Sequence, residues 1–271
     1  MLVPKIVLLS IVAKALWLIL GYSATQLKTA RRRRIYRLPL ASGQLRREAL
    51  SILNVLAVDT IFLLAFRYLT GLQFAPTSPV PFLLAFTWVF IGFELWFYVL
   101  HYAMHTRTFY FIHAQHHVAH VTNPLTSLSF SLAERALLMG GGLAIAGVGA
   151  ALMPFANAGL LAYLVVNYAL VVFQHSNVEW LPKWFVRSWL GKIFFTPTFH
   201  ALHHARFKGN YGLFIVWLDR LFHTQFDDYE AVHARVVAGE GLERLGERAT
   251  PLPRVHAMSP SRDHAPVTCD C

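Results

Sequence analysis

The chain has 271 residues, of which 56% are hydrophobic and only 14% are charged, and its formal net charge is +10. Soluble domains carry about 25% charged residues, so the composition favours a membrane protein, and its many aromatic residues exclude a disordered chain. Its two cysteines, Cys269 and Cys271, argue against a disulfide-stapled secreted domain.

Five apolar runs are long enough to cross a bilayer as helices. We expect them at residues 2–20, about 50–69, 80–100, about 135–153 and about 156–173. The pattern predicts an all-α, polytopic membrane helix bundle of about five spans. Run 2–20 could instead be a cleaved signal peptide, but its length and the arginines at 31–34 favour a retained span.

The basic residues predict the orientation of these spans. Of the 24 Lys and Arg residues, 21 fall in segments 21–49, 101–135 and 174–271, which five spans would place on one side. Cytoplasmic loops carry the excess of Lys and Arg, so we expect the N-terminus outside and residues from 174 onward in the cytoplasm. The arginine run then indicates topology and contact with anionic lipid, not nucleic-acid binding.

Histidines cluster in three boxes at the predicted cytoplasmic ends of the spans. The boxes have the form H-x-x-x-H, H-x-x-H-H and H-x-x-H-H, and one further histidine follows the fifth span; these nine residues are His101, His105, His113, His116, His117, His175, His200, His203 and His204. On a helix, residues three or four apart share a face, so each box should present its imidazoles to one point. One zinc takes about four ligands, so nine imidazoles suit two metal ions. Imidazole also binds Cu, Fe and Ni, which leaves the metal open.

With these motifs, the sequence resembles the fatty acid hydroxylase superfamily, also called the sterol desaturase-like family. The resemblance covers about residues 85–226. Beyond the boxes it includes His175-Ser176-Asn177, Thr196-Pro197, Asn210-Tyr211-Gly212 and the Asp219-Arg220-Leu221-Phe222 stretch. Two positions depart from the family pattern: His223 stands where Gly is common, and His120 where Ser is common.

The resemblance implies a non-haem di-iron oxygenase that uses O2 to hydroxylate or desaturate a lipid. The nine histidines would be the ligands of two iron ions, and no catalytic residue beyond them is expected. His120 could belong to the set or not, whereas His223, His233, His256 and His264 are expected to lie outside it. Electrons would come from a partner such as a ferredoxin, a reductase or a cytochrome b5-like protein, docked near Lys183, Arg187 and Lys192. The membrane would be a bacterial inner membrane or that of the ER.

Carboxylates near the boxes could orient the histidine rings. Glu94, seven residues before His101, is the main candidate for this role, with a packing role as the alternative; Glu134 and Glu179 are weaker candidates. Asp59, inside the second run, is expected to form a salt bridge between spans, with Arg67 as a possible partner.

The remaining expectations concern organisation and rival functions. Segment 180–189 should form an amphipathic helix on the membrane surface, and the domains should be 1–79, a catalytic 80–229 and a polar tail at 230–271. A His-rich metal transporter is the rival from another class, but it would place ligands at the bilayer midplane, where the predicted spans have no histidine. A zinc protease would need the H-E-x-x-H motif, which the chain lacks.

Overall fold

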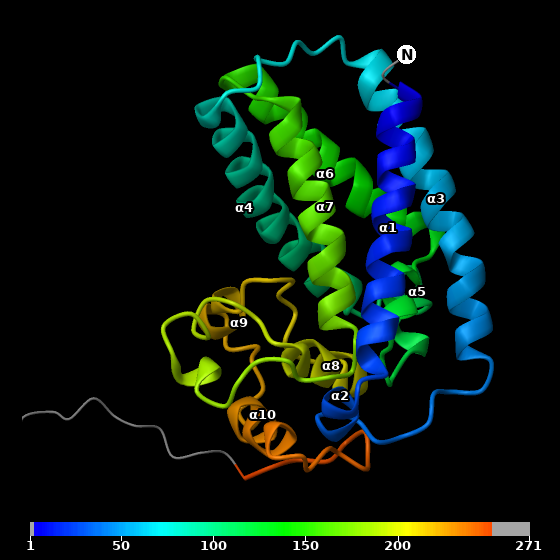
Figure 1. Ribbon diagram of the computed structural model, residues 1–271, viewed down its shortest axis with the longest axis vertical. Helices are drawn as coiled ribbons and strands as arrows, with labels where there is room; N and C mark the ends of the chain where they lie inside the picture. Colours follow the sequence, from blue (N-terminus) through cyan, green and yellow to red (C-terminus); the bar gives the residue numbers. More distant parts are fainter. Residues whose placement is uncertain (1–2, 251–271) are drawn as a thin grey trace, which may run out of the picture.

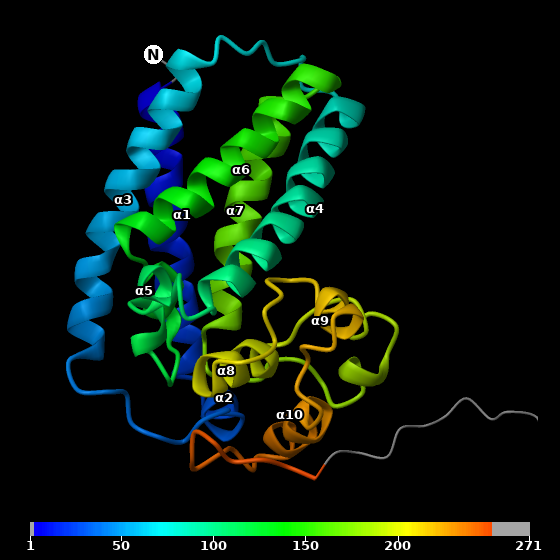
Figure 2. The same ribbon diagram turned by 180° about the vertical axis from the view of Figure 1, so that it is seen from behind.

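A computed structural model describes residues 3–250 as a bundle of long helices with a compact cap at one end (Figures 1 and 2). Five helices are long and apolar enough to cross a membrane, which confirms the predicted polytopic all-α fold. They are α1 (Val3–Thr25), α3 (Gln44–Leu69), α4 (Pro79–Met104), α6 (Leu132–Leu152) and α7 (Asn157–Gln174). Between residues 3 and 250, extended pairing is limited to three isolated bridges.

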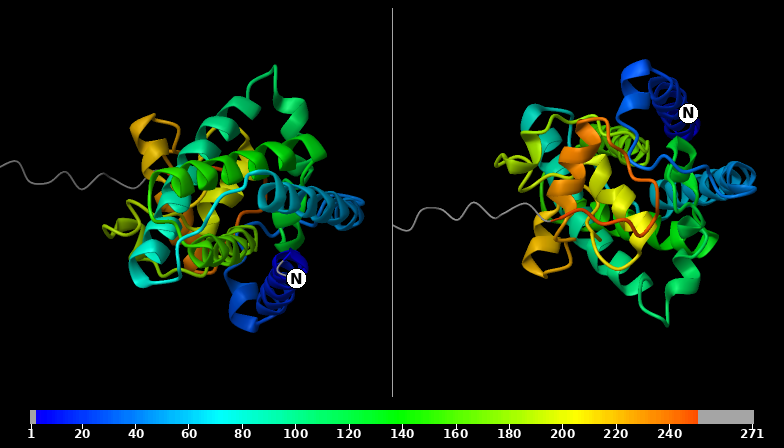
Figure 3. Two further views of the ribbon diagram at one scale, coloured as in Figure 1. Left: turned by 90° about the horizontal axis from the view of Figure 1, so that it is seen from above. Right: turned by 90° about the horizontal axis from the view of Figure 1, so that it is seen from below.

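The cap contains the short helices and lies at the end of the bundle opposite loops 70–78 and 153–156 (Figure 1). Its elements are α2 (Lys28–Arg32), α5 (Tyr110–His113), η1 (His116–Val118), η2 (Pro124–Leu128), η3 (Phe185–Arg187), α8 (Pro197–Arg206), α9 (Trp217–Leu221) and α10 (Tyr229–Val237). Seen from below, α8 and α10 lie across the end of the bundle (Figure 3). The cap therefore gathers the segments that the basic residues assign to one side of the membrane.

Helices α4 and α6 pack closely because small residues leave room for indole rings. A Cβ added to Gly141 would lie 2.1 Å from Nε1 of Trp96, so only glycine fits there. The same Trp96 nitrogen donates a hydrogen bond to the carbonyl of Leu137 at 3.3 Å. The glycine-rich centre of the fourth span thus seats the aromatic side chains of the third.

An ion-pair network joins three of the long helices. Asp59 of α3 accepts from Nζ of Lys14 in α1 at 2.8 Å and from Nε of Arg135 in α6 at 2.6 Å. The expected salt bridge between spans is therefore present, but the expected partner, Arg67, is wrong. Arg67 lies eight residues further along the same helix, about 12 Å away along its axis, since each residue adds about 1.5 Å.

Two other local expectations differ from the structure. Segment 180–189 does not form an amphipathic helix; its only helical turn is η3, and Trp184 and Trp189 are exposed beside it. The third span continues four residues past the predicted end, so that His101 lies in the last turn of α4.

The predicted polar tail begins with a packed helix. Val232 and Val236 of α10 are fully buried, as is Leu242, whose amide donates to the carbonyl of Ile35 at 2.7 Å. Cys269, Cys271, His256 and His264 lie outside the described residues. The domain boundaries themselves stay predictions.

Candidate metal centre

The nine box histidines converge into two adjoining groups in the cap. A five-histidine group contains His101, His105, His113, His117 and His203, and a four-histidine group contains His116, His175, His200 and His204. Within each group, the nitrogens that could bind a metal lie within 4.8 Å of one another. Eight of the nine side chains are buried, and His105 is intermediate. His120, His223 and His233 belong to neither group.

Five separate elements bring these side chains together. His101 and His105 come from the end of α4, and His175 caps the end of α7. His113 ends α5, whereas His116 and His117 open η1, so the second box is not one continuous helix as expected. The third box lies on α8, as its spacing predicts; its members are His200, His203 and His204.

The expectation that each box points to one site is wrong for the second and third boxes. In both, the residues four apart stay together: His113 with His117, and His200 with His204. The remaining histidine of each box, His116 or His203, faces the other group. On α8, residues four apart complete slightly more than one turn, whereas neighbours differ by about 100°, so the third box faces two adjacent groups. The second box divides in the same way, but across the break between α5 and η1.

Backbone carbonyls fix the tautomer of most rings. Because a carbonyl oxygen only accepts, each Nδ1 that meets one carries the proton, and Nε2 is left with its lone pair. The five pairs of this kind span 2.7–3.0 Å and join His101 to Tyr211, His116 to Ser129, His175 to Val171, His203 to Gly209 and His204 to Ala119. These rings are therefore set to bind through Nε2.

Several Nε2 atoms face one another at distances that suit a shared cation. Nε2 of His116 lies 3.3 Å from Nε2 of His175, and both rings have their proton on Nδ1. In the five-histidine group, Nε2 of His101 lies 3.0 Å from Nε2 of His113, and both of these rings have their proton on Nδ1. Two lone pairs at this separation repel, and a bound cation removes the repulsion. The donor set thus fits one metal ion in each group.

Burial keeps these imidazoles neutral. Desolvation holds the pKa of His116, His200 and His204 well below the ordinary value, and neighbouring histidines lower it further. Desolvation also lowers the pKa of His175, to about 4. Metal binding needs a neutral ring, so the groups are ready to bind at neutral pH.

Glu134, ranked among the weaker carboxylates, is the one that contacts a box histidine. Its Oε1 accepts from Nδ1 of His113 at 2.5 Å, and its backbone amide is capped by Oγ of Ser131 at 3.1 Å. Ser131 is the N-cap of α6, so the start of this helix places the carboxylate under His113.

Glu94 supports a box histidine indirectly, through the backbone of a loop. Its carboxylate accepts from the amides of Phe214 and Ile215 at 3.0 Å, and so holds the loop that carries Tyr211. The carbonyl of Tyr211 is the acceptor for His101. Glu94 thus supports a ring through a backbone segment, which combines the two roles that its sequence position left open.

Other motif residues hold the segments that carry the ligands. Asp219 accepts from the amides of Tyr211 and Gly212, both at 2.7 Å. Glu179 accepts from the amide and hydroxyl of Thr198 at the start of α8, at 3.1 and 2.7 Å. The sequence does not predict either role, because the groups that these carboxylates bind come close to them only when the chain folds.

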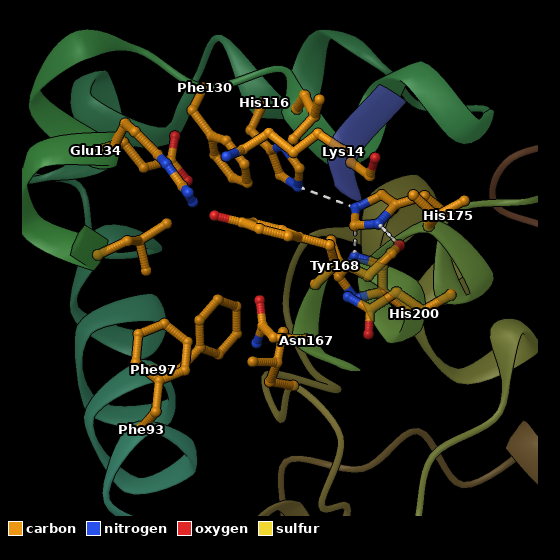
Figure 4. A pocket seen from close by; sticks show the side chains of 18 of the residues that line it. Lys14, Phe93, Phe97, His116, Phe130, Glu134, Asn167, Tyr168, His175 and His200 are labelled. Atoms are coloured by element: carbon orange, nitrogen blue, oxygen red, sulfur yellow. Dashed lines mark hydrogen bonds between the residues drawn. The ribbon is translucent and has the colours of Figure 1, made fainter. Parts of the chain in front are cut away.

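A cavity adjoins the four-histidine group on its bundle side (Figure 4). It contains about 640 Å³ of space not filled by atoms, a volume that includes space open to solvent. Its walls include His116, His175 and His200, the rings of Phe93 and Phe97 from α4, and Tyr168 from α7. An apolar molecule held there would lie against the four-histidine group.

Comparisons with known proteins agree with this geometry. The model of the family described as fatty acid hydroxylase matches residues 86–224. Very-long-chain aldehyde decarbonylase GL1-7 of Oryza sativa subsp. japonica is 28% identical over 162 residues, covering 54% of this chain and 24% of that protein. Protein CER1-like 2 of Arabidopsis thaliana is 28% identical over 205 residues, covering 71% of this chain and 32% of its own length. The chain thus spans about a quarter to a third of these relatives. No solved structure matches it.

Proposed function

Because the chain belongs to the fatty acid hydroxylase family, we propose that it is a di-iron enzyme that uses O2 to hydroxylate an unactivated C–H bond of a membrane lipid. The observation that carries the proposal is the pair of buried histidine groups, five and four imidazoles, with their Nε2 atoms turned inward. A lipid C–H bond offers no group for acid–base catalysis, and two bound irons would supply the O2-dependent redox chemistry that such a bond requires. The described residues also include five helices able to span a membrane, where such a lipid resides.

The chain itself would supply ligands, orientation and exclusion of water. The nine histidines would hold the two ions, one ion in each group. The backbone carbonyls and Glu134 would keep the rings in the orientation that binding needs. Phe93, Phe97 and Phe130 line the cavity, so these rings would exclude water from one side of the reacting part of the lipid, which would lie against the four-histidine group.

A second reaction on the same site is supported by the relatives. Several are named very-long-chain aldehyde decarbonylases, one of which is 32% identical over 154 residues. A decarbonylase would shorten an aldehyde by one carbon, whereas a hydroxylase adds 16 mass units and a desaturase removes two hydrogens. We keep hydroxylation as the first proposal and distinguish the three by product mass.

The rival metal transporter has less support. The histidine groups lie in the cap, with His101 in the last turn of α4 and His175 just beyond α7. Transporters bind their ions near the midplane, between discontinuous helices. Metal analysis separates the two proposals: about two tightly held irons per chain are expected, and one zinc would contradict the oxygenase.

The experiment compares cellular lipids and bound iron in the unaltered chain and three histidine variants. His203→Ala removes a member of the five-histidine group, and His116→Ala a member of the four-histidine group. Each should reduce iron content and abolish the lipid change. His120→Ala is the matched control, because this ring packs on Phe207 outside both groups. If the lipid change survives both group variants, the assignment of the ligands is wrong.

We further propose that the cap faces the cytoplasm and receives electrons from an acidic carrier such as a ferredoxin, a reductase or a cytochrome b5-like protein. Lys183, Arg187 and Lys192 are exposed on the cap and provide a positive surface for it. Rim charges act mainly on the association rate. Replacing all three by Gln should slow carrier-dependent turnover, while turnover with a small chemical reductant stays the same. Equal turnover with the carrier would contradict this docking site.

A further inference from the structure

Gln174 has a buried side-chain amide whose oxygen lacks a partner within the described part of the chain. It is the last residue of α7, directly before His175, and its side chain is 1% exposed. Within the described residues, its Oε1 has no hydrogen-bond partner. The side chain lines the cavity beside the four-histidine group. Because an unpaired buried amide costs free energy, its position in the wall calls for a polar ligand.

The two cationic groups of the same cavity, Lys14 and Arg135, already have partners. Lys14 pairs with Asp59 at 2.8 Å, and Arg135 makes two hydrogen bonds to the same carboxylate at 2.6 and 2.7 Å. The hydroxyl of Tyr168 donates to that carboxylate as well, at 3.3 Å. Both cations thus share one carboxylate. Among the described residues that line the cavity, the buried side-chain oxygens without a partner are Oε2 of Glu134 and Oε1 of Gln174, and Gln174 is the one directly before His175.

A second cavity continues from the first into the bundle. The two share Phe93, Arg135, Leu138, Asn167 and Tyr168, and the second contains about 420 Å³ of space not filled by atoms, part of it open to solvent. Its further walls are mostly aliphatic: Val89, Met139, Leu143, Leu160 and Leu164. The combined space is therefore polar at the end near the histidines and apolar at the end within the membrane.

We propose that Oε1 of Gln174 accepts a hydrogen bond from a hydroxyl group at the polar end of the lipid substrate, whose hydrocarbon chain extends into the second cavity. The inference rests on the proposed function, since it names the substrate class of that site. An amide oxygen only accepts, so its partner must donate, and a hydroxyl is an uncharged oxygen group that can do so. The substrate is then a single-chain lipid with an oxygen near one end, and the carbons next to that oxygen lie nearest the four-histidine group.

Binding to the purified full-length protein in nanodiscs tests the proposal without relying on turnover. The probes are radiolabelled 1-hexadecanol and hexadecane, which differ only by one hydroxyl. We expect the unaltered protein to bind the alcohol about tenfold more tightly than the alkane, as one buried hydrogen bond would give. Gln174→Met keeps the length of the side chain and removes the amide; it should bring this ratio close to one and leave hexadecane binding unchanged.

Gln73→Met is the matched control, because Gln73 is exposed in the loop at the far end of the bundle and should keep the tenfold ratio. The proposal is overturned if the unaltered protein does not prefer the alcohol, if it binds neither probe, or if Gln174→Met retains the preference, in which case water satisfies the amide. Failure of the oxygenase proposal would instead appear as absent iron or absent lipid product, with the binding ratio intact.

Discussion

Glu134 is the residue on which the orientation of the five-histidine group depends most directly. Its carboxylate accepts from His113 at 2.5 Å, and the His113 ring in turn faces His101 through Nε2. A charge-assisted acceptor both fixes the tautomer and makes the ring a stronger ligand. The corresponding acceptors of the other rings with a fixed tautomer are neutral backbone carbonyls, so Glu134 is the one that a side-chain substitution can remove.

We predict that Glu134→Gln weakens iron retention by about 10–100-fold, the usual effect of losing such a carboxylate. The amide is the same size, so the helix start at Ser131 should stay intact. Iron per chain after dialysis against a graded chelator series is the measurement. Glu240→Gln, on an exposed position after α10, provides the matched control. Equal iron retention in both variants would show that Glu134 does not support the metal site.

His223 has a backbone conformation that suits glycine. Its φ is +55°, and its side chain is exposed in the turn after α9. The left-handed region costs a non-glycine residue about 1–2 kcal/mol. The glycine that the family commonly has at this position therefore reflects backbone geometry, and the histidine here need not have a role in metal binding.

Accordingly, His223→Gly should raise the free energy of unfolding by about 1 kcal/mol and leave iron content unchanged. Thermal unfolding of the detergent-solubilised protein measures the first quantity, and metal analysis the second. Asp227→Gly, also exposed but not at positive φ, should instead destabilise the protein slightly. Loss of iron in His223→Gly would mean that the ring takes part in the site after all.

Among the elements, α3 is held to its neighbours through Asp59. This one carboxylate binds Lys14 of α1 and Arg135 of α6, and its side chain is 3% exposed. Three helices that are far apart in sequence are thereby fixed at one depth. The network also makes α1 an integral part of the bundle.

Breaking this network should be costly, because each cation would be left without its partner in an apolar environment. We expect Asp59→Asn to lower the stability by about 3–5 kcal/mol. Adding Lys14→Met to Asp59→Asn should restore part of that loss, since it removes one of the stranded charges. Unfolding curves of the two single variants and the double variant give the coupling energy. Additive losses would show that Lys14 and Asp59 do not interact.

Sequence patterns predicted the elements better than their contacts. Runs of about 20 apolar residues depend only on local composition, and all five became long helices. The boxes were visible because ligand type and spacing are local too. Their division into two groups was not, because it depends on how α8 meets η1 across about 85 residues of chain. The partner of Asp59 and the support given by Glu134 were uncertain or wrong for the same reason.

At the scale of the whole molecule, the cap places the basic segments and the histidine groups at the same end of the bundle. The basic segments 21–49 and 174–250 and both histidine groups lie at one end, and loop 70–78 lies at the other (Figure 2). Excess Lys and Arg mark the cytoplasmic side of a membrane protein. We therefore expect a reductant of the cytoplasm to reach the side on which the two histidine groups lie.

Accessibility of single cysteines in intact cells tests this sidedness. In a chain whose Cys269 and Cys271 are replaced by Ser, Gln73→Cys lies in the loop opposite the cap and Arg244→Cys lies on the cap; both positions are exposed. A membrane-impermeant maleimide should label Gln73→Cys in intact bacterial spheroplasts and Arg244→Cys only after permeabilisation. The cysteine-free chain reports background labelling. The reverse pattern would put the histidine groups outside the cytoplasm and remove the cytoplasmic electron carriers from the proposal.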